Sequence, residues 1–143
     1  MTEGADAMMD ETVQPGQTSE ARMDVRFSDT AQALQLSGAD RYPPVFATSR
    51  MVALMEIAAA RMLNRLLQPG QLSVGVNVDI RHTAATPVGA TVRARATYLG
   101  EEGKLHRFRV EAFDDAGPIG EGEHTRAIVS TERLMAGAEK RKD

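Results

Sequence analysis

The sequence predicts an α+β domain built from one long helix and a five-stranded antiparallel sheet, and three observations support this. Residues 46–67 form the only long stretch with the composition of a helix. Five other segments alternate apolar and polar side chains, as half-buried strands do. Tight turns join most of the last four segments, which implies antiparallel pairing. Because one helix covers such a sheet poorly, we expect a second subunit to cover the remaining edge and apolar surface.

The composition describes a soluble globular protein without disulfides. The chain has 143 residues, of which 42% are hydrophobic, and it contains no cysteine. No apolar run approaches membrane length, and the N-terminal stretch lacks the basic start and apolar segment of a secretory signal, so we expect a cytoplasmic protein. The net charge of −3 and the scarcity of aromatic residues argue against nucleic-acid binding.

The chain divides into three parts. Residues 1–17 are small and acidic with no apolar periodicity, which predicts a disordered tail. Residues 18–134 contain all the periodic segments and form the domain. Residues 135–143 are rich in Gly, Lys and Arg, and we expect them to be a frayed C-terminal tail.

The domain begins with a strand and an irregular lead-in. Residues 20–27 alternate as a half-buried strand, and residues 28–36 predict a short helical turn. In the next segment, residues 38–44, Pro43 and Pro44 exclude a helix and hold the backbone extended. The side chains of this lead-in are therefore expected near the N-terminus of the long helix.

The central helix carries one polar residue that its neighbours do not explain. We expect Thr48 to cap the first turn, and Pro69 and Gly70 to end the helix. Most polar side chains gather on one arc, but Glu56 lies outside it among apolar residues, with no Lys or Arg three or four residues away. A carboxylate on the buried side of a helix either has a distant partner or is kept for chemistry.

Four strands follow the helix. In residues 72–83 the even-numbered side chains share one face, so His82 ends an otherwise apolar row. Residues 91–99 and 106–112 alternate as the next two strands, and residues 119–131 form the last. This layout places Glu56 and His82 on facing surfaces, where they can meet within a subunit or across a dimer.

Three polar residues suit acyl-transfer chemistry, although each also has a structural explanation. A threonine hydroxyl beside the free amides of a helix N-terminus can stabilise an oxyanion, a carboxylate can act as base or nucleophile, and an imidazole can move a proton. Thr48 is equally explained as a helix cap, and His82 as a hydrogen-bonded core histidine. Glu56 favours the functional interpretation, because no local partner satisfies it.

Other candidates are weaker. His106 and His124 have no metal-ligand spacing with His82, so we expect no metal site. Gly120 and Gly122 resemble no phosphate-binding loop, because no helix follows them, and they favour a bulge or a close approach in the sheet.

Four motifs resemble the fluoroacetyl-CoA thioesterase-like family of the hotdog-fold thioesterase superfamily, and the likeness spans about residues 40–131. They are Val45-Phe-Ala-Thr48, Met51-Val-x-Leu-Met-Glu56, His82-Thr-Ala-Ala-Thr-Pro87 and Ile119-Gly-x-Gly-x-His-x-Arg-Ala127. The resemblance implies a hotdog domain that dimerises through its sheets. It also implies catalytic roles for Thr48, Glu56 and His82, and an active-site position for Gly75.

Further substrate contacts are implied at Tyr42, Phe46 and Arg126. Tyr42 lies in the lead-in that covers the pocket, where the fluoroacetyl enzyme has phenylalanine, and Ala39 and Asp40 replace further bulky or acidic features of that lid. Arg126 matches a family arginine that can contact CoA or a carboxylate, although an arginine on a strand is more often solvated or paired at the surface.

The resemblance implies hydrolysis of a short or compact acyl-CoA thioester by a homodimer. CoA is part of the substrate, and no cofactor is implied. Water would attack the thioester directly, or it would hydrolyse an acyl anhydride formed with Glu56. A small pocket is expected, because the helix side chains beside Glu56 are small: Val52, Ala53, Ala59 and Ala60. Two alternatives stay open: a hotdog enoyl-thioester hydratase, and a non-catalytic acyl-CoA-binding module that has no need of a buried carboxylate.

Overall fold

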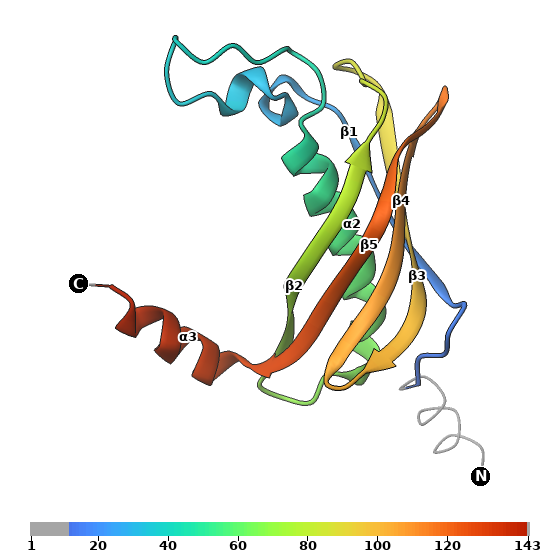
Figure 1. Cartoon of the computed structure of the whole chain (residues 1–143), viewed down its shortest axis with the longest axis vertical. Helices are drawn as coiled ribbons and strands as arrows, with labels where there is room; N and C mark the ends of the chain where they lie inside the picture. Colours follow the sequence, from blue (N-terminus) through green and yellow to red (C-terminus); the bar gives the residue numbers. More distant parts are fainter. Residues whose placement is uncertain (1–11, 143) are drawn as a thin grey trace.

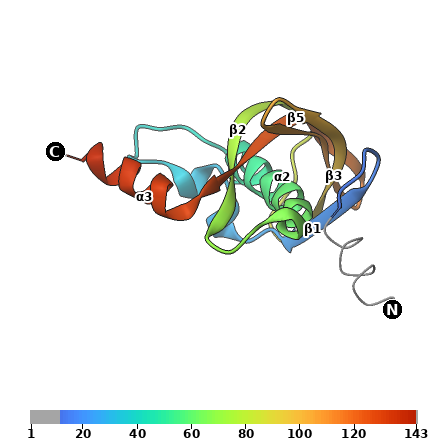
Figure 2. The same cartoon turned by 90° about the horizontal axis from the view of Figure 1, so that it is seen from below.

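The structure is a computed structural model of the chain and describes residues 12–142. A single antiparallel sheet curls around one helix, as predicted (Figures 1 and 2). The strand order in the sheet is β1-β3-β4-β5-β2, so β1 and β2 form its two edges. The elements in chain order are β1 Thr18–Asp24, α2 Thr48–Leu63, β2 Gln71–His82, β3 Thr91–Glu102, β4 Leu105–Asp114, β5 Gly117–Ser130 and α3 Thr131–Lys140.

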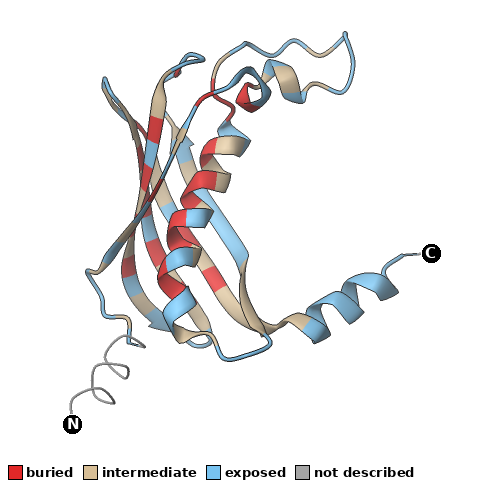
Figure 3. Cartoon of the chain, turned by 180° about the vertical axis from the view of Figure 1, so that it is seen from behind, coloured by how far each residue is buried: buried red, intermediate tan, exposed pale blue. Residues whose placement is uncertain are grey.

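The core lies between α2 and the inner face of the sheet (Figure 3). Met51, Met55 and Leu63 of the helix are almost completely buried, and each such side chain contributes about 1.5–3 kcal/mol through removal of apolar surface from water. Gly120 lets the helix approach β5, because a Cβ there would stand 2.6 Å from the Met51 sulfur. A Cβ at Gly122 would collide with the Asp79 carbonyl oxygen of β2. The expected close approach at these two glycines is confirmed.

Strand β2 departs from strict alternation because of a bulge. Its register with β5 shifts between Gly75 and Asn77, which leaves Val76 as the extra residue. Val78, Ile80 and His82 face the helix as predicted, since they pair with inward-facing residues of β5. Before the bulge the faces are exchanged: Ser73 and Gly75 point inward and Leu72 and Val74 point outward, so the predicted single apolar row from Leu72 to His82 is wrong for its first half.

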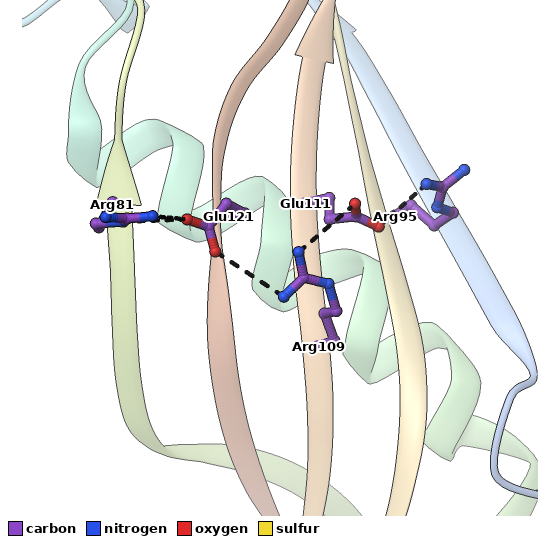
Figure 4. A network of polar contacts seen from close by, with 5 residues as sticks. All are labelled: Arg81, Arg95, Arg109, Glu111 and Glu121. Carbon is purple, nitrogen blue, oxygen red and sulfur yellow. Dashed lines mark hydrogen bonds and ion pairs between the residues drawn. The ribbon is translucent and has the colours of Figure 1, made fainter.

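The outer face of the sheet is charged. Five side chains from four strands form a row of alternating sign on the side away from α2: Arg81, Glu121, Arg109, Glu111 and Arg95 (Figure 4). The shortest pair joins Arg81 Nη2 to Glu121 Oε2 at 2.8 Å. These partly exposed pairs each contribute about 0–1 kcal/mol, and they keep this face solvated.

The segment between β1 and α2 folds over the N-terminal end of the helix (Figure 1). The predicted helical turn is present as two short 3-10 turns, Phe27–Asp29 and Gln32–Leu34. The end of the segment is fixed by an isolated bridge between Val45 and Pro87 and by a hydrogen bond from the Phe46 amide to the Thr86 carbonyl at 2.8 Å. We call residues 27–47 the lid.

The two ends of the domain differ from the predicted tails. Residues 131–140 form helix α3, whose N-cap Ser130 accepts a hydrogen bond from the Arg133 amide at 3.2 Å. The predicted frayed tail, residues 135–143, is therefore wrong over residues 135–140: a capping serine followed by good helix formers begins a helix even though the residues of that helix stay exposed (Figure 3).

At the other end, residues 1–11 lie outside the described residues, so most of the predicted disordered tail stays a prediction. Residues 12–17 are ordered, since Val13 packs against the core and the Gly16 amide donates to the Tyr98 carbonyl at 2.8 Å. Across the described part of the chain, no helix is both long and apolar enough to cross a membrane.

Candidate active site

A mainly apolar cavity of about 620 Å³ lies between the lid and the N-terminus of α2. Leu34, Tyr42 and Pro43 line it from the lid, while Thr48 and His82 supply polar groups from the helix and from the end of β2. This volume is in the range of small-molecule sites. The pocket was expected beneath the lead-in that carries Tyr42 and beside Glu56. The structure agrees with the lead-in as its cover, but the cavity lies at the N-terminus of α2 and Glu56 does not line it.

Thr48 pairs with His82 at this cavity. The Thr48 Oγ1 lies 2.8 Å from His82 Nδ1, which is hydrogen-bond distance. Thr48 is the first helical residue, and Ala47 takes the N-cap position without any side-chain cap bond. The predicted capping role of Thr48 is therefore wrong, because its hydroxyl is directed to His82.

Burial sets the protonation state of His82. Removal from water lowers the pKa of His82, and a backbone interaction with Ala84 opposes part of this shift. The ring is therefore neutral at neutral pH. Its Nε2 atom is buried and has no hydrogen-bond partner among the described residues, which leaves one ring nitrogen available for a proton transfer.

The Glu56 carboxylate is hydrogen-bonded to a residue far away in the sequence, Arg126, and the sequence analysis did not predict this pair. Its Oε2 accepts a hydrogen bond from Arg126 Nη1 at 3.1 Å, and it lies 3.8 Å from His124 Nε2. The Glu56 side chain remains 37% exposed, whereas that of Arg126 is only 8% exposed. Arg126 is thus a buried residue, and the expectation of a surface arginine is wrong, because Ser73 and Glu56 satisfy its guanidinium group.

The structure brings together two of the three predicted catalytic residues within one protomer. Thr48 and His82 are in contact, but Glu56 lies eight residues further along α2, about 12 Å along the helix axis at 1.5 Å per residue. Among the described residues no hydrogen bond or ion pair joins Glu56 to His82. The predicted facing of Glu56 and His82 therefore gives no contact inside a single protomer.

Gly75 lies beside the Glu56 carboxylate. A Cβ at position 75 would overlap Glu56 Oε2 and would stand 3.2 Å from His124 Cε1. The glycine therefore makes room for the carboxylate at strand β2. Of the other predicted substrate contacts, Tyr42 and Phe46 line the cavity, with Tyr42 54% exposed and Phe46 buried at 1%, whereas Arg126 lies beside Glu56 and does not line it.

Comparison with known proteins decides the family. The family model described as fluoroacetyl-CoA-specific thioesterase matches residues 25–132. A fluoroacetyl-CoA thioesterase of Streptantibioticus cattleyicolor is 43% identical over 95 residues, which cover 66% of this chain and 68% of that protein. The chain belongs to the fluoroacetyl-CoA-specific thioesterase family.

Solved structures agree with this family membership. The fluoroacetyl-CoA thioesterase FlK superimposes with a TM-score of 0.86 at 34% identity, covering 92% of this chain and 99% of that one. A mutant of FlK in complex with fluoroacetate and CoA gives 0.79 at 35% identity, covering 85% and 99%. A Thermus thermophilus protein described as a thioesterase superfamily member gives 0.81 at 27% identity, covering 92% and 94%. The predicted hotdog fold is confirmed.

Sequence reasoning missed one polar residue of this family member's site. His124 is 2% exposed, and it contacts both Arg126 and the backbone of β2. His124 and Arg126 alternate on β5 and share its inner face, and the bulge between Gly75 and Asn77 brings the backbone of β2 to them. His106 is the cross-strand partner of Arg126 on β4, but its own hydrogen bond is to the Tyr98 hydroxyl, at 2.8 Å from its Nδ1. No group of residues suited to hold a metal ion is found within residues 12–142.

Proposed function

We propose that this family member hydrolyses a short or compact acyl-CoA thioester to the free acid and CoA. The observation that carries the proposal is the contact of Thr48 Oγ1 with His82 Nδ1 at 2.8 Å, at an apolar cavity on a helix N-terminus. The name of its relative, fluoroacetyl-CoA thioesterase, supports the reaction class, and the solved complex of an FlK mutant with CoA supports the ligand class.

The N-terminus of α2 suits the developing negative charge. The first amides of a helix have no acceptor within the helix, and the helix dipole adds positive potential there. With the thioester carbonyl in the cavity, these amides and the Thr48 hydroxyl stabilise the tetrahedral oxyanion. In direct hydrolysis, oxygen from water bonds to the carbonyl carbon and the carbon–sulfur bond breaks. The proton that water gives up to Glu56 or to neutral His82 passes to the departing thiolate.

Glu56 supplies the negative group of the reaction, as base for water or as nucleophile through an acyl anhydride. In one protomer it lies too far along α2 to reach the Thr48–His82 pair. A homodimer removes this difficulty if the β2 edges of two copies pair antiparallel about a two-fold axis. An axis near Val78 brings the His82 end of one strand beside Gly75 of the partner subunit, and therefore close to Glu56 of the partner subunit.

The exposed surface of β2 supports this interface. Val76 is 53% exposed and Val78 is 42% exposed, on an edge strand whose outer backbone groups are unpaired within the sheet. The outer face of the sheet is a poorer candidate for a dimer contact, because its charged row would lose its hydration on burial (Figure 4). Sedimentation at micromolar concentration should show twice the mass of the chain; a monomer that still hydrolyses thioesters contradicts this assembly.

The activity is tested with acetyl-, fluoroacetyl-, butyryl-, phenylacetyl-, crotonyl- and palmitoyl-CoA, following free thiol and acid together. We expect release of CoA with the acids of about two to six carbons. Tight binding without thiol release identifies a binding module instead. Hydration of crotonyl-CoA with the thioester intact identifies a hydratase.

A mixing experiment tests whether the site spans two subunits. Glu56→Gln and His82→Ala chains are produced together so that dimers form at random, and each variant is also assayed alone. If the residues act across the interface, half the dimers are mixed and each has one intact site, so activity returns to about a quarter of wild type. If they act within one subunit, every site keeps one defect and the mixture stays as inactive as the separate variants.

A further inference from the structure

Two buried polar side chains of β5, Arg126 and His124, lie against the Glu56 carboxylate. Arg126 donates from Nε to the Ser73 Oγ and from Nη2 to the Ser73 carbonyl, both at 2.9 Å. Its remaining bonds come from Nη1, which meets Glu56 Oε2 at 3.1 Å and His124 Nε2 at 3.2 Å. The two contacts to Ser73 hold one side of the guanidinium group, and the two contacts of Nη1 hold the other.

The hydrogen-bond partners of His124 fix its tautomer. Its Nδ1 lies 2.8 Å from the Asn77 carbonyl oxygen, which can only accept, so Nδ1 carries a hydrogen. Its Nε2 faces an arginine nitrogen, which can only donate, so Nε2 carries none. The ring is therefore neutral. Burial acts in the same direction and lowers the pKa of His124, with a smaller lowering from the Arg126 charge against opposing contributions from Asn77 and Glu56.

We propose that His124 is a positioning residue whose Nε2 holds Nη1 of Arg126 in place against the carboxylate of Glu56. This role rests on the proposed function, in which Glu56 takes part in thioester hydrolysis. The ring acts through Arg126, because its Nε2 lies 3.8 Å from Glu56 Oε2, beyond hydrogen-bond distance. Packing supports the same orientation, since the Phe108 ring lies 6.5 Å from the His124 ring, centre to centre.

Two substitutions separate the two nitrogens of the ring. His124→Asn keeps a donor close to the Nδ1 position for the Asn77 carbonyl but leaves Arg126 Nη1 without its acceptor. His124→Gln reaches further and restores an acceptor oxygen near the Nε2 position. We expect His124→Asn to lower kcat about tenfold or more with little change in KM, because small displacements of a reacting group are costly. We expect His124→Gln to keep kcat within about threefold of wild type.

A double-mutant cycle asks whether the effect passes through Glu56. In a Glu56→Gln background, His124→Asn should cause no further loss of kcat, because the carboxylate that it positions is already gone. An equal loss in both backgrounds overturns the positioning role and leaves His124 a structural residue. Full turnover by Glu56→Gln alone overturns the proposed role of Glu56 instead, so the two failures are distinguishable.

Nitrogen NMR of the histidine rings tests the proposal on the wild-type protein, even if a variant fails to fold. The resonances of His124 are assigned by comparison with His124→Gln or, failing that, through bonds from its backbone. We expect His124 to be neutral at pH 7, with Nδ1 protonated and Nε2 bare. A ring protonated at Nε2, either alone or as imidazolium, cannot accept from Arg126 and overturns the proposal.

Discussion

Adding one methyl group at Gly75 should impair turnover while leaving the fold intact. In Gly75→Ala the new Cβ overlaps Glu56 Oε2 and stands 3.2 Å from His124 Cε1. Glu56 Oε2 must retreat by about 1 Å to restore ordinary contact, which breaks its 3.1 Å hydrogen bond to Arg126. Because a misplacement of about 1 Å can cost a hundredfold in rate, we expect kcat to fall by about two orders of magnitude.

The fold should tolerate this change, because the displaced atom is the end of a flexible side chain. The backbone at Gly75 is extended rather than left-handed, so alanine adds no backbone strain. We expect the melting temperature to fall by only a few degrees, as for a change of about 1 kcal/mol. Gly137→Ala is the matched control: a Cβ there meets nothing within 4 Å, and kcat should not change.

Steady-state kinetics with acetyl-CoA decides the outcome. A fall in kcat with KM nearly constant supports a misplaced carboxylate. A rise in KM with kcat unchanged shows instead that Gly75 makes room for substrate. A folded Gly75→Ala enzyme with wild-type kcat and KM refutes the argument that the position of the Glu56 carboxylate controls the rate.

Three further predictions concern single residues of the site. Glu56→Gln and His82→Ala should each lower kcat by at least about a hundredfold. Thr48→Ala should lower kcat by less, and Thr48→Ser should leave kcat nearly unchanged. If Glu56→Gln keeps the wild-type kcat, the Glu56 carboxylate has a structural role only. Tyr42→Phe should raise the ratio of kcat/KM for fluoroacetyl-CoA to kcat/KM for acetyl-CoA, because the lid loses a hydroxyl. A wild-type enzyme that already prefers fluoroacetyl-CoA by more than about a thousandfold would show that the Tyr42 hydroxyl does not relax the selectivity. Folding lowers the pKa of His124, so below about pH 6.5 this histidine binds a proton in the unfolded chain before it does so in the folded protein. As the pH falls below that value, the free energy of unfolding therefore decreases by up to about 1.4 kcal/mol per pH unit. Urea unfolding at pH 7.5, 6 and 5 should show a shallower loss in His124→Gln than in wild type, and equal slopes contradict the assignment.

Local patterns predicted most of the fold. The long Ala-, Leu- and Met-rich run became α2, and period-2 alternation located each strand to within a few residues. The helix cap was placed one residue late, because Thr48 has the right chemistry for a cap and nothing local reveals that its hydroxyl contacts His82, 34 residues away. Helix α3 was not predicted, because none of its residues is buried and its sequence therefore lacks the apolar periodicity of a helix that packs on a core.

The site was predicted as residues but not as contacts. Glu56 was singled out because it lacks a partner on its own helix, which left two explanations, a distant partner or a role in chemistry; the structure shows that a distant partner exists. Its partner Arg126 was predicted as a residue that can contact CoA or a carboxylate, against the usual surface location of strand arginines, but its pairing with Glu56 was not predicted because the two residues are 70 positions apart. In the proposed homodimer, whether Glu56 also meets His82 depends on how the two subunits pair, which no pattern within one chain can place.

The bulge at Val76 explains why strict alternation failed at this site. Counting back from His82 in steps of two places Val76 and Val74 against the helix, and it turns Gly75 and Ser73 outward. In that register Glu56 would meet a valine side chain, and Arg126 would lose both of its contacts to Ser73. The extra residue reverses the faces, so Gly75 admits the carboxylate, while the Asn77 carbonyl accepts from His124. One inserted residue therefore places Gly75 beside Glu56 and still keeps His82 on the inner face with Thr48, which is how a bulge re-aims the side chains of a strand.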